Sequence, residues 1–113
     1  MTAFMFTTDK ENNMANHILP SDVNSPKKHW MLSKVLYDDG PSGISIAVGY
    51  WDGEAKIAIR WNGNKDHRIG NPQSSGHPTW FILPSGPYGE SVIAALPKDM
   101  QTLARNFLIT EKK

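Results

Sequence analysis

Short apolar runs separated by glycine-containing turns dominate the chain from Trp30 onward. Within each run, apolar and polar residues tend to alternate, and β-branched and aromatic residues are frequent. This pattern is typical of β-strands that bury one face. We predict strands over residues 30–38, 43–51, 54–61 and 80–83.

The strongest turn signal is the dipeptide Asp52-Gly53, which lies between two of these runs. Asp-Gly suits the two-residue type I′ turn of a β-hairpin, whose central residues both need positive φ. The turn would pair Trp51 with Glu54 and, at the far end, Ile44 with Trp61, and it sorts the side chains between two faces. One face, which we expect to be core, carries Ile44, Ile46, Val48, Tyr50, Ile57, Ile59 and Trp61. The other carries Ser45, Ala47, Gly49, Lys56, Ala58 and Arg60.

The two outer strands are less well defined. In residues 30–38, alternation places Met31 and Val35 on one side and Trp30 and Leu36 on the other, so both sides are expected to be partly buried. We expect this strand to pair antiparallel with residues 43–51. The run at 80–83 lies between two prolines, which cannot donate to a ladder, so we expect it at a sheet edge or at a position where the pairing terminates.

The last third of the chain has apolar residues at helical spacing, but Pro97 interrupts the series. Two interpretations remain: two helical segments broken at Pro97, or an extended segment over 91–96 followed by a helix that begins at Pro97. Both place an amphipathic helix over residues 99–108. The predicted fold class is α+β, with an antiparallel sheet of four or more strands and a C-terminal amphipathic helix packed on one face.

Residues 1–28 are predicted to form a polar N-terminal arm, and residues 29–113 a single α+β domain. The arm is rich in Asn and turn-forming residues. It is either a flexible leader or an ordered segment that wraps the domain or a partner through Met5, Phe6, Ile18 and Leu19. No basic stretch precedes the apolar residues near Met1, so we expect no signal peptide.

Composition and charge narrow the class of protein. The chain has 113 residues, and 12 Lys+Arg against 11 Asp+Glu give a formal net charge of +1. That balance lacks the basic excess typical of proteins that bind nucleic acids or anionic membranes. The absence of Cys excludes disulfides, cysteine-ligated metal centres and thiol nucleophiles, and it suits a cytoplasmic protein. We expect no cofactor, and no segment approaches the ~20 apolar residues of a membrane-spanning helix.

Histidines and serines in the loop over residues 66–77 are the candidates for chemistry. Asp66 and His67 precede His77 at a spacing that matches no established metal-ligand motif, so we predict no metal. Ser74 and Ser75 stand close to His77, but the G-x-S-x-G element of serine hydrolases is absent. We therefore favour a turn built from Asn71, Pro72, Ser74, Ser75 and Gly76, with the histidines on the surface or stabilising the turn.

Seven aromatic residues lie in the predicted strands. Packing within the sheet accounts for most of them, but Trp51 falls on the face of small residues. The candidate recognition surface therefore groups Trp51 with Lys56, Arg60 and Trp80, with His67 and His77 as further binding candidates. The same face is smooth enough for a second subunit, and we predict a possible homodimer through it. Stacking of single-stranded bases near Arg60, Lys65 and Arg68 is disfavoured by the neutral charge.

The elements R-W-N-G, I-G-x-P and P-x-W-F-x-L-P resemble a group of small bacterial proteins, some of them encoded on mobile gene cassettes. The resemblance covers about residues 34–84 and implies a bacterial, cytoplasmic accessory protein, without an activity or catalytic residue. The long polar arm and the SGPYG segment depart from that pattern. Its motif positions are Arg60, Trp61, Asn62, Gly63, Gly70, Pro72, Gly76, Pro78, Trp80 and Phe81.

Taken together, these features favour a non-enzymatic binding or interaction module that engages another protein. The alternative is a small-ligand-binding protein or minimal hydrolase that uses the loop over residues 66–77. A concave site with convergent polar groups would favour the ligand, and an exposed aromatic patch would favour the protein partner.

Overall fold

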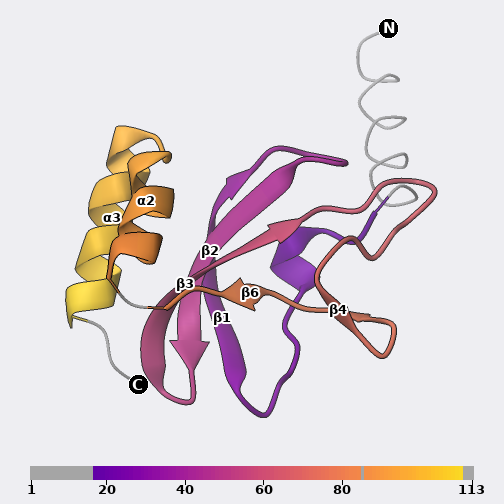
Figure 1. The fold of residues 1–113 in the computed structure, drawn as a ribbon, viewed down its shortest axis with the longest axis horizontal. Coiled ribbons are helices and arrows are strands. Elements are labelled where there is room, and N and C mark those ends of the chain that lie inside the picture. The colour runs from indigo at the N-terminus through magenta and orange to yellow at the C-terminus, as the bar shows by residue number, and fades with distance from the viewer. Residues whose placement is uncertain (1–16, 85, 111–113) are drawn as a thin grey trace, which may run out of the picture.

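The computed structural model of the protein describes residues 17–84 and 86–110. A four-stranded antiparallel sheet in the order β1-β2-β3-β6 forms its centre, with helices α2 and α3 at one end and the small β4–β5 hairpin at the other (Figure 1). The predicted α+β class is confirmed. The elements are η1 (Pro20–Asp22), β1 (Trp30–Asp38), β2 (Ile44–Trp51), β3 (Glu54–Trp61), β4 (Gln73–Ser74), β5 (His77–Pro78), β6 (Phe81–Ile82), α2 (Pro87–Ala94) and α3 (Lys98–Thr110).

The β2–β3 hairpin has the predicted register over its whole length, from Trp51 opposite Glu54 to Ile44 opposite Trp61. Asp52 and Gly53 form the turn with φ of 50° and 87°, as a type I′ turn requires. The predicted edge strand is also present, as the shorter β6 beside β3. Local turn chemistry and side-chain alternation therefore determine the middle of the sheet.

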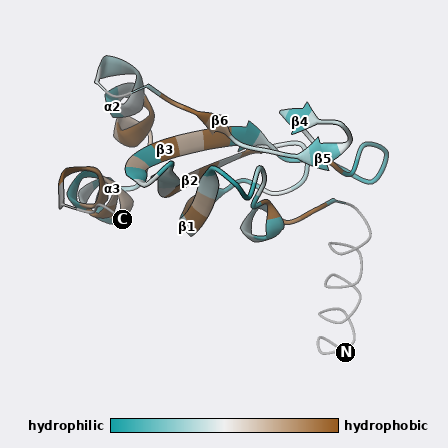
Figure 2. Ribbon diagram, turned by 90° about the horizontal axis from the view of Figure 1, so that it is seen from below, coloured by the Kyte–Doolittle hydropathy of each residue, from teal (hydrophilic) through white to brown (hydrophobic). Residues whose placement is uncertain are grey.

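The helices cover one face of this sheet and form the first hydrophobic core with it (Figure 2). On this face the tilted rings of Tyr50 and Phe107 join the sheet to α3, with centroids 5.1 Å apart. The buried members of this core are Leu36, Ile46, Val48, Ile57, Leu83, Ile93, Leu96 and Ala104.

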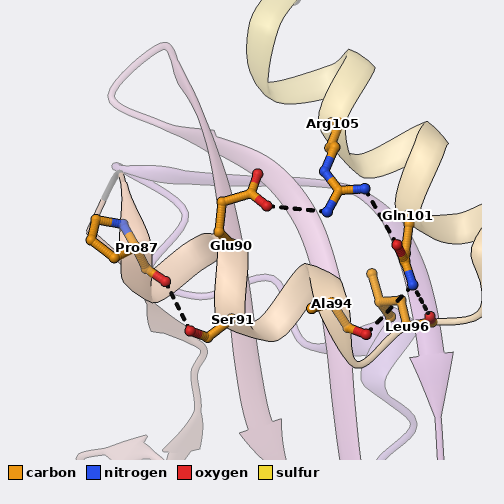
Figure 3. Close-up of polar contacts among 7 residues, drawn as sticks. All are labelled: Pro87, Glu90, Ser91, Ala94, Leu96, Gln101 and Arg105. Atoms are coloured by element: carbon orange, nitrogen blue, oxygen red, sulfur yellow. Dashed lines mark hydrogen bonds and ion pairs between the residues drawn. The ribbon is translucent and has the colours of Figure 1, made fainter.

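The chain breaks into two helices at Pro97, so the first of the two predicted interpretations is confirmed and an extended segment over residues 91–96 is wrong. The Gln101 side chain spans the break, its Nε2 donating to the carbonyls of Leu96 at 2.8 Å and Ala94 at 3.4 Å (Figure 3). These carbonyls at the end of α2 lack helical partners, so Gln101 stabilises both helix ends at once. Arg105 and Glu90 add an ion pair across the two helices at 3.1 Å.

The opposite face of the sheet packs against a second hydrophobic core. Val23 is fully buried there, although it belongs to the predicted arm, and its carbonyl accepts a bond of 2.7 Å from the Trp80 indole. Residues 17–28 thus pack on the domain, whereas Met5 and Phe6 lie outside the described residues. The buried members of this second core are Val23, Trp30, Ala47, Ala58 and Trp80.

Strand β1 departs from the strict alternation predicted for it. Its pairing with β2 shifts between Leu32 and Lys34 and again between Val35 and Tyr37. Each shift adds a residue to one strand and changes which side chains share a face. Val35 consequently joins Trp30 and Leu32 on the second core, whereas Leu36 enters the first.

Within the described part of the chain, no helix has both the length and the apolar composition needed to cross a bilayer.

Candidate binding site

The apolar face under the helices continues past the point where the helices end. Side chains that are cross-strand neighbours on this face form rows. In the row under the helices, Val48, Ile57 and Leu83 are all buried, whereas in the row at the other end Trp61 is 59% exposed. Leu83 extends the β3–β6 pairing, its N–H donating to the Ile57 carbonyl at 3.0 Å. From the covered end to the open end, the rows are Val48 with Ile57 and Leu83, Ile46 with Ile59 and Phe81, and Ile44 with Trp61.

An open groove of about 460 Å³ occupies the uncovered end of this face. Two large aromatic side chains in its lining, Trp61 and Phe81, are 59% and 54% exposed. Trp61 was predicted to be core, and that prediction is wrong: it lies on the predicted face, but the helices end before reaching it. The lining consists of Ile44, Ile59, Arg60, Trp61, Asn71, Pro72 and Phe81.

The loop over residues 69–79 closes one side of the groove and is attached to β3 through Trp61. The Trp61 N–H donates to the Asn71 carbonyl at 2.7 Å, and the Asn71 N–H donates back to the Trp61 carbonyl at 3.0 Å. This antiparallel bridge brings Pro72, which follows a cis peptide bond, into the groove lining together with Trp61 and Phe81. Pro72 in turn accepts a bond of 3.0 Å from the Thr79 N–H, which fixes the far end of the loop.

Arg60 fixes the same loop from the opposite face of the sheet. Its side chain is only 2% exposed, and the guanidinium donates to the carbonyls of Ile69 and Thr79, which lie at the two ends of the loop. Desolvation by burial lowers the pKa of Arg60 to about 10, so the group still carries its charge at neutral pH. The loop carbonyls therefore engage the charge of Arg60, which offers no free cation to a ligand.

Close backbone packing explains the glycines at position 70, within the loop, and at position 63, just before it. Gly70 has φ of 72°, and a Cβ there would lie 2.7 Å from Nη2 of Arg60 and closer still to the Trp61 carbonyl. A Cβ on Gly63 would overlap the carbonyls of His67 and Arg68. Any larger residue would push the loop away from Arg60 and deform the groove.

Asn62 anchors the other end of the R-W-N-G element. It is buried, accepts a bond of 2.8 Å from Ser45 Oγ, and donates to Asp38 at 3.0 Å and the Gly40 carbonyl at 2.8 Å. Three members of the R-W-N-G element therefore stabilise the fold: Arg60, Asn62 and Gly63. Trp61 is the member whose side chain is exposed to solvent. An apolar side chain whose neighbours fix its backbone but leave its ring exposed is a candidate for contact with a binding partner.

Trp51, the leading sequence candidate, has partners within its own chain. Its ring stacks on His29 with centroids 5.2 Å apart and an interplanar angle of 22°, and it packs against the second core. His29 Nδ1 lies 2.7 Å from Asp52 Oδ1, which links the hairpin turn to the start of β1. Trp51 is therefore half-buried and stabilises the hairpin end.

The other candidates on the small-residue face do not form an open surface with it. Trp80 is 5% exposed and Arg60 is buried, because Val23 and Trp30 cover this face. Lys56 lies near Glu54, at 3.8 Å between Nζ and Oε1. A partner that approached this face would first have to displace the second core.

The loop candidates His67 and His77 are exposed and line two separate shallow pockets. His67 shares one with Ser42 and Asn64, and His77 shares the other with Ser25, Ser74, Ser75 and Thr79. Ser74 pairs with His77 across the β4–β5 hairpin, yet no hydrogen bond joins the His77 ring to Ser74 or Ser75 within the part of the chain that the structure describes. Among those same residues, no three His, Asp or Glu side chains cluster as metal ligands. The loop behaves as a structured turn.

Sequence reasoning missed the groove because it assigned Trp61 and its neighbours to the core. The available signal was the mismatch between a core face that runs the length of the hairpin and a single short amphipathic helix to cover it. Asn71 and Pro72 could not have been placed there, because their position depends on the backbone bridge to Trp61.

In the comparisons with known proteins, no family model, curated protein or solved structure matches the chain. The groove is therefore interpreted from its own geometry.

Proposed function

We propose that the protein is a non-enzymatic interaction module that binds a protein partner through the Trp61–Phe81 groove. The observation that carries the proposal is a pair of aromatic side chains, each more than half exposed, on the hydrogen-bonded continuation of the core face. Exposed aromatic residues held in a concave apolar setting are typical of interface hot spots.

The chemistry of the lining supports binding in preference to catalysis. Among the described residues that line the groove, only Arg60 has an ionisable side chain, and its guanidinium is engaged by two carbonyls; none has a hydroxyl or thiol. A site of this composition can exclude water and hold an apolar group, but it holds no nucleophile or general base. The partner should therefore present uncharged apolar groups. We propose that the interaction takes place in a bacterial cytoplasm, as the resemblance to small bacterial proteins implies.

A peptide-display selection tests the proposal. Random peptides are selected on the parent protein and then measured on the double variant Trp61→Ala/Phe81→Ala and on the control Tyr88→Ala. Tyr88 is 65% exposed on α2 and is absent from the groove lining, so its variant controls for general loss of exposed aromatic surface. Circular dichroism confirms that all three proteins are folded.

We expect enriched peptides to bind the parent and Tyr88→Ala equally and to lose at least about tenfold in affinity on the double variant. Selection of peptides that bind the double variant as well as the parent would place the interaction elsewhere. Failure to enrich any peptide would also count against the proposal.

A further inference from the structure

We infer that the partner segment is an extended, proline-rich peptide in the polyproline II conformation. This inference rests on the proposed function and specifies the occupant of the same groove. Three properties of the groove carry it: the area of aromatic surface, the hydrogen-bonding groups at the rim, and the nature of the adjacent sheet edge.

The exposed aromatic area is small compared with what a stable dimer needs. With about 200 Å² of surface for each aromatic side chain, exposures of 59% and 54% leave roughly 230 Å² on Trp61 and Phe81. A standard protein interface buries about 800 Å² on each partner. In an interface with a second copy of this chain, these two side chains would supply less than a third of the buried surface on each partner. A few residues of an extended peptide would cover an area of about this size.

Two residues that line the groove carry side-chain donors that the fold does not use, and the same two residues also line the adjoining hollow beside Ser42 and His67. Within the described residues, neither the side-chain amide of Asn71 nor the indole N–H of Trp61 has a hydrogen-bond partner, although the backbone groups of both residues pair with each other. A polyproline II segment has the complementary requirement, because its carbonyls are free and its prolines bring no N–H. Proline rings also pack on aromatic side chains, which is how aromatic-lined grooves recognise such segments.

The charge of the lining and the sheet edge argue against other occupants. The described lining residues present no free charge to the groove, because the Arg60 guanidinium is buried on the other face of the sheet. Neither a phosphate backbone nor an acidic peptide finds a partner among them. The neighbouring edge strand β6 is two residues long and closely followed by Pro84, which is too short a template for adding a β-strand. The occupant that fits the groove is therefore an uncharged, extended segment that does not pair as a β-strand.

Nuclear magnetic resonance titration tests the inference on the protein as it is. The probes are an oligoproline peptide of about ten residues, a leucine-alanine peptide and a glycine-serine peptide of the same length. The readout is the indole N–H signal of Trp61, assigned through Trp61→Phe, in the parent, in Phe81→Ala, in Asn71→Ala and in the control Tyr88→Ala.

We expect the oligoproline to shift the Trp61 signal, with an affinity that falls at least about tenfold in Phe81→Ala and stays unchanged in Tyr88→Ala. Asn71→Ala should weaken binding by roughly fivefold, as loss of one hydrogen bond of about 1 kcal/mol predicts. High salt should leave the affinity unchanged, because no charges meet in the groove.

Binding of the leucine-alanine peptide but not of oligoproline overturns the inference and leaves the proposed function in place. If none of the peptides shifts the Trp61 signal, the inference is wrong, and the display selection decides separately whether the groove binds proteins. A concentration-dependent shift without peptide would identify a second copy as the occupant and also overturn it.

Discussion

Arg60 is the residue on which the shape of the groove depends most. A buried guanidinium without a carboxylate partner is costly, and here the cost is offset by hydrogen bonds to two backbone carbonyls at the ends of one loop. Because arginine has several donors in a fixed planar arrangement, it can hold both carbonyls together, which lysine could not do with the same geometry. The side chain thus converts a flexible connection into a wall of the site.

Arg60→Ala should lower the free energy of unfolding by about 3 kcal/mol or more, since each hydrogen bond to a charged group contributes about 1.5–3 kcal/mol and both carbonyls lose their charged donor. Urea denaturation measures the change. Arg105→Ala is the matched control: its ion pair with Glu90 is exposed, and we expect less than about 1 kcal/mol there. Equal losses for the two variants would mean that Arg60 does not fix the loop.

At the scale of elements, strand β3 combines features that could be predicted from the sequence with one that could not. The Asp52-Gly53 turn and the alternation beside it are local, so the hairpin register and the two faces could be predicted from sequence. The extent to which α2 and α3 cover one face is set by packing between distant segments, and no local pattern contains it. The same limit applies to Val23, because its burial on the second face depends on contacts with residues far along the chain, such as Trp80.

A graded series along β3 tests this description of the core face. Ile57, Ile59 and Trp61 share one face, and their burial decreases in that order. We expect Ile57→Ala to cost about 2–5 kcal/mol, Ile59→Ala about 1–2 kcal/mol, and Trp61→Ala within about 0.5 kcal/mol of the parent. Urea melts give the three values. A cost for Trp61→Ala that equals the cost for Ile57→Ala would show that Trp61 is core after all.

At the scale of the whole molecule, the sheet has one face shared between two helices and a groove, and another closed by Val23, Trp30 and Trp80. The closed face was the surface on which the sequence favoured self-association. The open apolar surface lies on the opposite side and is small, which suits a partner segment better than a second subunit.

Sedimentation equilibrium checks the expected oligomeric state. We expect the parent to be a monomer at micromolar concentrations, because the exposed aromatic area is less than a third of what a standard interface buries on each partner. The double variant Trp61→Ala/Phe81→Ala should sediment identically. A dimer that dissociates in this variant would assign the groove to self-association, and a dimer that persists in it would require another surface.

The most direct test of the open groove is the solvent accessibility of the four tryptophans in one sample. A soluble paramagnetic reagent broadens the indole N–H signals of exposed rings, and substitution of each Trp by Phe assigns them. The structure predicts strong broadening for Trp61, weaker broadening for Trp51, and protection for Trp30 and Trp80, which are 2% and 5% exposed. A Trp61 signal as protected as those of Trp30 and Trp80 would contradict the account, because the apolar face would then be closed.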